Sequence, residues 1–349
     1  MSAVYSSSAL RAEVKSVSQL ASRRRSRRRL LGLFALLLVV FAVSLFFGRY
    51  PQVGLISPAQ LAEDSLAQRL ILNLRLPRLI ASLLIGMSLA GVGMVMQMVF
   101  ANPLVEPGFL GVSQASAFGA AVSILVLGGV NWQVQISAIL FGLFGLALSY
   151  LLARRVRYGG WVLRLLLAGI AVSALFASGV GLIKYLADPL RQLPDITFWL
   201  LGSLSSITWR AVLSVLPLIS LGLVFLWLMR WRLNLLALED EVVFSLGVAA
   251  NRERLLVLFM AVVITAASIS ISGLIGWVGL LVPQLARRLS GADSRDGLPT
   301  AFLLGGIFMI VCDDLARTLS AGEIPLGVLT SLLGAFGFLI LMTRRTVKV

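Results

Sequence analysis

Long apolar segments, separated by short polar or basic stretches, run through most of the chain. A membrane-spanning helix needs roughly 20 mostly apolar residues. The segments that come near this requirement are 30–47, 78–100, 108–128, 134–153, 163–183, 209–229, 255–272, 274–288, 300–318 and 323–342. The eighth segment is short and rich in glycine and proline. The pattern predicts an all-α polytopic membrane protein with about ten transmembrane helices.

The spacing of these segments divides the chain into a tail and a membrane domain. Residues 1–29 form a basic tail that ends in the run Arg23–Arg29, and residues 30–345 form the transmembrane domain. The first apolar segment lacks a small-residue cleavage site, so it is predicted to be an anchor and not a cleaved signal. Residues 230–254 are predicted to form a cytoplasmic loop.

The distribution of positive charge predicts the orientation. Cytoplasmic segments of membrane proteins carry an excess of Lys and Arg. With the N-terminus inside, all but eight of the 30 Lys and Arg residues fall on the cytoplasmic side. The eight on the outside are Arg49, Arg69, Arg75, Arg78, Lys184, Arg191, Arg210 and Arg317. Both termini are therefore predicted to be cytoplasmic.

Composition excludes several classes of chemistry. The chain is 59% hydrophobic and 13% charged, whereas soluble domains are about 25% charged. It contains one cysteine, Cys312, and no histidine, so an internal disulfide, a cysteine metal cluster and a histidine base are excluded. No glycine-rich phosphate loop is present, which argues against nucleotide hydrolysis by this chain and against an enzyme. The net charge of +15 fits topology and anionic lipid better than nucleic acid.

Two arginines at the start of the second span are predicted to lie on the outside, although basic residues are enriched on the cytoplasmic side. Arg75 and Arg78 flank Pro77, a residue suited to the first turn of a helix because its missing N–H would be unpaired there. One interpretation is that both side chains extend to lipid headgroups.

The cytoplasmic loop contains an amphipathic segment, Leu235–Gly247. Its apolar residues Leu235, Leu238, Val242 and Leu246 recur at helical spacing. The acidic residues between them are Glu239, Asp240 and Glu241. A helix lying on the headgroups is one interpretation, but acidic residues disfavour it because the inner leaflet is negative.

Small residues form a stripe in the fifth span. Gly169, Ser173, Ala177 and Gly181 are four residues apart, so they share one helix face. Such a stripe indicates close helix packing within the subunit, or a smooth wall of a transport path, or packing at one end and a path at the other.

Few ionisable residues lie deep in the predicted spans: Asp313, Asp314 and Glu106. We expect Asp313 to pair with Arg317, one turn away. A carboxylate chain typical of proton-driven carriers is not evident, so a secondary active transporter is the less favoured alternative.

Six motifs, in order, resemble those of the FecCD-type permease family of ABC importers for iron–siderophores, haem and vitamin B12. They begin with RLPR (Arg75–Arg78) and NPLVEPGFLGVSQASAFGA (Asn102–Ala120). The others are RLLLAG (Arg164–Gly169), LNLLALEDEVVFSLGV (Leu233–Val248), GLIGWVGLLVPQLAR (Gly273–Arg287), and DDLAR (Asp313–Arg317) with EIPLGVLTSLLGA (Glu323–Ala335). The resemblance covers about residues 51–345. The chain departs from the family pattern at Glu239, Gln284 and Phe336.

The resemblance implies a type II ABC importer permease fold in a bacterial inner membrane. It implies a homodimer or heterodimer of permease chains, two ABC ATPase subunits below and a substrate-binding protein above. By the resemblance, Arg75, Arg78 and Arg317 dock the binding protein, and Leu235–Gly247 is the coupling helix that contacts the ATPase. The stripe of the fifth span then lines the path or the dimer interface.

The cargo is the least determined feature. A weakly charged path without histidine suits a large, already chelated cargo better than a bare metal ion. An iron–siderophore complex is the leading expectation, and haem or vitamin B12 fits the same residues. No resident cofactor or metal is expected.

Overall fold

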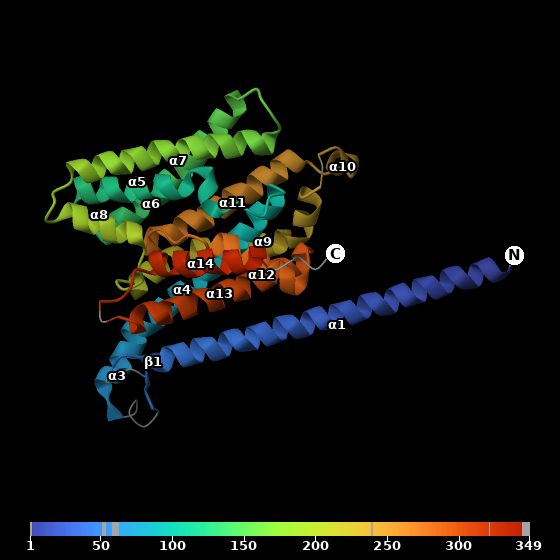
Figure 1. Cartoon of the computed structure of the whole chain (residues 1–349), viewed down its shortest axis with the longest axis horizontal. Coiled ribbons are helices and arrows are strands. Elements are labelled where there is room, and N and C mark those ends of the chain that lie inside the picture. The colour runs from blue at the N-terminus through green and yellow to red at the C-terminus, as the bar shows by residue number, and fades with distance from the viewer. Residues whose placement is uncertain (1, 51–53, 58–62, 239, 321, 344–349) are drawn as a thin grey trace.

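The structure is a computed structural model that describes residues 2–50, 54–57, 63–238, 240–320 and 322–343. The described chain is helical apart from one short antiparallel hairpin formed by β1 (Phe47–Gly48) and β2 (Gly54–Leu55). This hairpin follows the first helix and was not predicted. Most of the helices lie side by side in one bundle and run roughly along a common direction (Figure 1).

The helices are α1 (Ser2–Phe46), α3 (Ser65–Leu70), the π-helical turn η1 (Ile71–Arg75), α4 (Leu76–Val99), the 3-10 turn η2 (Pro107–Leu110), α5 (Val112–Leu127), α6 (Asn131–Arg155), α7 (Trp161–Leu186), α8 (Gln192–Leu201), α9 (Trp209–Leu236), α10 (Asp240–Ser245), α11 (Ala250–Ser272), α12 (Val278–Ser290), α13 (Ser294–Thr318) and α14 (Leu326–Thr343).

Each of the ten predicted spans corresponds to a helix. Eight helices of the described chain are long and apolar enough to cross a membrane, and α5 is a shorter apolar helix of 16 residues. The remaining predicted span, 274–288, corresponds to α12, which has only 13 residues. The prediction of an all-helical polytopic membrane protein is therefore confirmed, with α8 as an additional short helix.

The expectation that residues 274–288 form a span was wrong in its start and in its reach. Gly273 and Trp277 have φ angles of 69°, so the chain turns sharply before α12 begins at Val278. A Cβ on Gly279 would contact Pro107 and the carbonyl of Leu89, which lies in the middle of α4. At about 1.5 Å per residue, 13 residues cover about 20 Å, so α12 runs from mid-depth to one side only.

The second span starts earlier than predicted. Asp64 caps α3 by accepting hydrogen bonds from the backbone N–H groups of Leu66 and Ala67, and the helix then continues through η1 into α4. Pro77 lacks the N–H that would continue the regular ladder, which explains a π-helical turn directly before it. The helical stretch is Ser65–Val99, and it contains both arginines of the RLPR motif.

Close glycine contacts fix α4 at the centre of the bundle. A Cβ on Gly86 would clash with the carbonyl of Gly305 in α13, and a Cβ on Gly305 would clash with the carbonyl of Gly86. Gly93 meets the backbone of Gly279 in α12 in the same way. Since lipid supplies no hydrophobic drive between helices, such backbone approach is how membrane helices gain packing energy.

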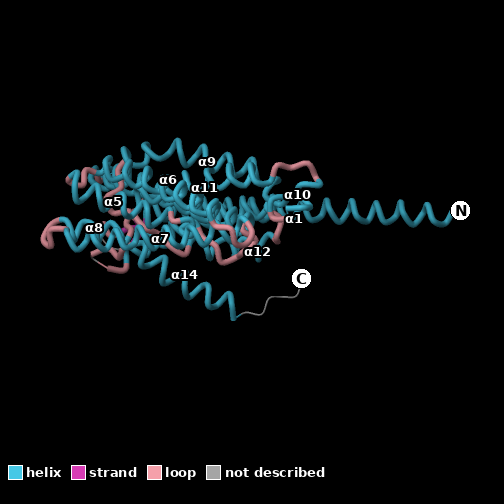
Figure 2. Tube along the Cα trace, turned by 90° about the horizontal axis from the view of Figure 1, so that it is seen from above, coloured by secondary structure: helices cyan, strands magenta, loops and turns pink. Residues whose placement is uncertain are grey.

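Two opposite faces of the bundle differ in what covers them. In Figure 2, α9 forms one edge of the bundle, whereas α14 forms the opposite edge with α7 and α8 toward it. Helix α1 runs beside α13 and continues unbroken through the predicted tail, away from the bundle (Figure 1). The boundary of the tail at residue 29 stays a prediction.

Candidate functional site

Arg78 joins three elements at one end of the bundle. Its Nε lies 2.9 Å and 3.0 Å from the two carboxylate oxygens of Asp313, and its Nη1 lies 3.1 Å and 3.0 Å from those of Glu323. The side chain of Asp313 is fully buried, whereas that of Glu323 is 38% exposed. Arg78 thus links α4 to α13 and to the segment that leads into α14.

Arg317 pairs with Asp314 and not with Asp313, so the expected pair was wrong. Its Nε lies 3.1 Å from Asp314 Oδ1, and its Nη2 donates to the carbonyl of Ser44 at 2.7 Å. Consecutive helical residues point about 100° apart, so Asp313 faces α4 while Asp314 faces α1. Arg317 therefore holds the end of α1 against α13.

Arg75 is bound to the end of α1 as well. Its Nη1 donates to the carbonyls of Leu45 and Phe46, at 3.4 Å and 3.2 Å. Arg75 and Arg317 are 9% and 8% exposed, so neither presents a free guanidinium to a partner in this conformation. The Arg78 side chain is only 11% exposed, but its partner Glu323 is 38% exposed, so this ion pair is the one of the three arginine contacts that includes a half-exposed carboxylate.

A hydrogen bond between Tyr50 and Asp64 joins the hairpin region to the start of α3. The Tyr50 hydroxyl donates to Asp64 Oδ2 at 2.9 Å. This hydrogen bond, together with the backbone N–H of Ala67, lowers the pKa of the Asp64 carboxyl below its ordinary value. The carboxylate form is the one that caps α3 and so positions the helix that carries Arg75 and Arg78.

The periodicity of the predicted coupling segment, Leu235–Gly247, had suggested one continuous helix, but the structure divides this segment between two helices. Helix α9 ends at Leu236, and α10 (Asp240–Ser245) follows after a break. Leu238, Val242 and Leu246 are 43%, 44% and 56% exposed, while Val243 is buried beneath them. Leu235 lies half-buried in the last turn of α9 and Gly247 has a φ of 73° after α10. Glu241 is exposed, and Glu239 lies outside the described residues.

Arg254 holds this segment to α11. Its side chain is buried, at 4% exposed. Nε and Nη2 donate to the carbonyl of Leu236 at 3.2 Å and 2.9 Å, and Nη2 also donates to that of Leu238 at 3.2 Å. These carbonyls are at the end of α9, where a helix leaves its last acceptors unpaired. Arg254 was not among the predicted site residues, although a basic residue within one helical turn of a loop was a usable signal.

The stripe of small residues has a packed end and an open end. A Cβ on Gly169 would clash with the carbonyl of Phe109, whereas a Cβ on Gly181 would meet nothing. Ala177 is exposed, and Ser173, between the two ends, lines a cavity of about 310 Å³. The mixed interpretation, with packing at one end only, is the one that this geometry favours.

Two cavities meet on the α7–α14 side of the bundle. The first, of about 310 Å³, lies beside Ser173, Ser113 and Gln114, and the second, of about 750 Å³, lies along α8 and α14. Leu274, Gly276 and Trp277 line both. No lysine or arginine lines either cavity.

Glu106 is the one ionisable residue among those lining these cavities. Its carboxyl group interacts electrostatically with the backbone N–H of Trp277, the residue that precedes α12. A carboxylate is favourable at the N-terminus of a helix. Glu106 therefore has a structural role in joining the segment before η2 to the start of α12.

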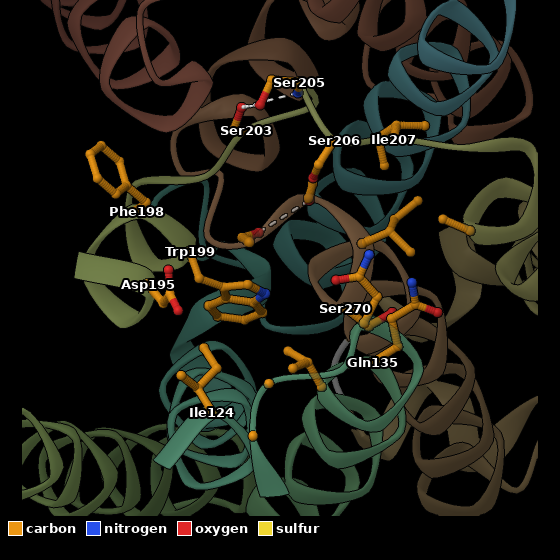
Figure 3. A pocket seen from close by; sticks show the side chains of 18 residues that line it. Ile124, Gln135, Asp195, Phe198, Trp199, Ser203, Ser205, Ser206, Ile207 and Ser270 are labelled. Carbon is orange, nitrogen blue, oxygen red and sulfur yellow. Dashed lines mark hydrogen bonds between the residues drawn. The ribbon is translucent and has the colours of Figure 1, made fainter. Parts of the chain in front are cut away.

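A polar cavity of about 370 Å³ lies at the end of the bundle that contains the α8 helix. Trp199 of α8 and Gln135 of α6 approach it from different helices (Figure 3). Its other polar residues are Asn131, Asp195, Ser203, Ser205, Ser206, Ser270 and Ser272. The sequence analysis missed this cavity; the run Ser203–Ser206 was its only local signal. Among the described residues, no three His, Cys, Asp or Glu side chains gather as a metal site.

The comparisons with known proteins agree with the arrangement of helices. Residues 36–344 match the FecCD transport family. The chain is 39% identical over 325 residues to the molybdate import system permease protein MolB of Haemophilus influenzae, covering 90% of this chain and 96% of MolB. It is 41% identical over 275 residues to the "Probable iron chelatin transport system permease protein" of Helicobacter pylori, covering 79% and 82%.

A solved structure extends the agreement to the fold. The structure of a metal-chelate type ABC transporter in an inward-facing conformation superimposes with a TM-score of 0.85 at 38% identity, covering 91% of this chain and 100% of that chain.

The helical bundle and these matches define the class of the protein as the transmembrane permease subunit of an ABC importer. The chain belongs to the FecCD transport family. It is not itself catalytic, and it works with an ATPase and a binding protein. The secondary-transporter alternative is set aside by this membership.

Proposed function

We propose that the protein is the permease of an iron–siderophore importer in a bacterial inner membrane, with both termini in the cytoplasm. The observation that carries the proposal is the pair of cavities on the α7–α14 side, which are mostly apolar and lined by no basic residue. A large chelate in which organic ligands already shield the metal can pass such a wall without strong binding.

A bare oxyanion is the principal alternative, because MolB is named for molybdate. A tetrahedral dianion is recognised by arginine, lysine or oriented N–H groups. The cavities offer Glu106 in place of a cation, which disfavours a desolvated anion beside it. Haem and vitamin B12 are large and shielded as well, so the wall does not separate them from a siderophore complex.

The partner permease belongs on the face that carries α7 and α14. This face has the open end of the small-residue stripe, at Ala177 and Gly181, and the exposed side chains of Leu332 and Phe336 on α14. A second permease chain, identical or different, would close the two cavities into a path between the subunits. The remaining apolar surface is in contact with lipid.

The ATPase contact is proposed at the exposed apolar row Leu238, Val242 and Leu246. A protruding element of this kind transmits motion to the helices as a lever, which is a gating role. The binding protein is proposed to dock at the opposite end, where the half-exposed Glu323 covers Arg78 and a carboxylate of the binding protein would take its place. Arg75 and Arg317 support that end through their contacts with α1, so their part in docking is indirect.

The test is transport by the complete importer reconstituted in liposomes with its ATPase and binding protein. Uptake of a ferric siderophore that depends on ATP, with no uptake of molybdate, supports the proposal. Uptake of molybdate in its place contradicts the iron assignment while it leaves the permease class intact. Haem and cobalamin are supplied in parallel, and preference for either one also contradicts it.

A further inference from the structure

Two guanidinium groups share one indole ring at the end of α9. The Cζ of Arg295 lies 3.7 Å from the centre of the Trp231 ring, and that of Arg230 lies 5.8 Å from it. Arg230 also stacks on Trp227, at 4.0 Å, and donates to the carbonyl of that residue. Cation–π contacts of this kind stabilise a guanidinium group but do not neutralise its charge, so the group can still pair with an anion.

The two arginines have no carboxylate partner among the described side chains. The ion pairs of that part of the chain involve Arg78, Arg232 and Arg317. Two acids lie beside Arg295 in the chain, Asp296 directly after it and Asp293 two residues before it. No ion pair of the described residues involves Asp296, and Asp293 accepts hydrogen bonds from Asn234 Nδ2 at 2.7 Å and from the backbone N–H of Arg295 at 2.9 Å. Two like charges gathered around one ring repel, so an anion placed between them would be favourable.

The position of the cluster indicates which anion is available. Exposed apolar residues recur at helical spacing along α9, on the edge of the bundle opposite α14 (Figure 2). They are Leu218, Leu221, Val224 and Leu228. At the end of this row lie Trp227 and Trp231, which are 44% and 48% exposed. An apolar stripe that ends in tryptophans is typical of a lipid-facing helix where it reaches the headgroups.

We propose that Arg230 and Arg295, seated on Trp227 and Trp231, bind the phosphate headgroup of an anionic phospholipid in the cytoplasmic leaflet. The guanidinium groups supply paired donors to phosphate oxygens, and the indole rings lie at the boundary with the acyl chains. Because Arg295 is in the first turn of α13 and Arg230 is near the end of α9, the lipid joins these two helices. The inference does not depend on the cargo, only on the orientation of the chain.

The full-length protein is purified in mild detergent, and binding of phosphatidylglycerol is followed by native mass spectrometry. Because both charges that face the headgroup are removed, R230Q/R295Q is expected to weaken binding about tenfold or more. The matched control is R155Q/R157Q, which removes two exposed arginines from another loop on the same side and is expected to bind as the parent does.

Four outcomes overturn the proposal. Equal loss in the R155Q/R157Q control indicates general charge attraction and no site. Equal retention of phosphatidylcholine by the parent protein, or displacement of phosphatidylglycerol by millimolar inorganic phosphate, shows that an anionic lipid is not the specific ligand. Unchanged lipid binding in R230Q/R295Q, with reduced co-purification of the ATPase, assigns the cluster to the ATPase contact.

Discussion

Arg78 and Asp313 form a buried ion pair at the end of the bundle where α4 begins and α13 ends, with Nε 2.9 Å from Oδ1. The two residues are far apart in sequence and belong to α4 and α13. The pair therefore fixes the relative position of two helices that also touch through Gly86 and Gly305.

Removing one member of this pair is expected to destabilise the protein strongly. Loss of one partner of a buried ion pair costs up to about 3–5 kcal/mol, and Asp313→Asn leaves Arg78 with the half-exposed Glu323 in place of a fully buried carboxylate. Asp313→Asn is therefore expected to lower the thermal unfolding midpoint in detergent clearly. Glu323→Gln removes a half-exposed partner and is expected to cost about 1 kcal/mol or less. Equal stability of the Asp313→Asn variant and the parent would show that the pair is not structural.

Substitution of Glu323 also tests docking, because the direction in which the affinity for the binding protein changes can be predicted. If a carboxylate of the binding protein takes the place of Glu323 on Arg78, then Glu323→Gln removes the internal competitor. Docking is expected to tighten in Glu323→Gln and to weaken in Arg78→Gln, measured as affinity of the binding protein for the importer in nanodiscs. Weaker docking in both variants would instead mean that Glu323 only stabilises the structure of this end of the bundle.

The exposed row Leu238, Val242 and Leu246, proposed to face the cytoplasm, predicts an ATPase contact. Val242→Asp places an unpaired charge in a contact that would otherwise be apolar, so the affinity for the ATPase is expected to fall about tenfold or more. The control is Tyr158→Asp, at a residue that is 75% exposed in another loop on the same side. Co-purification and stimulated ATP hydrolysis are measured together. An unchanged affinity in Val242→Asp would refute the coupling assignment.

Arg254 is expected to transmit the motion of that contact without making it. Hydrogen bonds to a charged group contribute about 1.5–3 kcal/mol, so Arg254→Gln releases Leu236 and Leu238 from α11. The expected result is a complex that still binds and hydrolyses ATP but transports poorly, with partial recovery in Arg254→Lys. Arg252→Gln, at an exposed residue of the same turn, is the control. Loss of ATPase binding in Arg254→Gln would indicate that the arginine only folds the loop.

The helices could be predicted because their apolar length is a local property. The partners of the charged residues could not, because they depend on which helix faces each residue. Asp313 and Asp314 are adjacent, and sequence spacing alone favoured the pair of Asp313 with Arg317 within one helix. The structure instead pairs Asp313 with Arg78, a residue of α4, and the sequence contains no periodicity that records this contact.

The break before α12 was visible only in part. Glycines around residue 274 indicated a weak helix, but the left-handed backbone of Trp277 was not predictable, because it is imposed by packing. Its N–H meets Glu106, and the adjoining Gly279 fits closely against Pro107. For the same reason the cavities beside Trp277 could not be predicted, since segments distant in sequence build them.

The open end of the stripe on α7 predicts where a second permease lies. A photo-crosslinking amino acid at Gly181, where added atoms meet open space, is expected to capture a protein in the intact membrane complex. The same substitution at Leu221, 68% exposed on α9, is expected to capture lipid and no permease. An adduct of twice the chain mass indicates a homodimer, and an adduct with a different permease indicates a heterodimer. If Leu221 yields the permease adduct and Gly181 does not, the interface is on the α9 side, and the path proposed between the subunits at α7 and α14 is wrong.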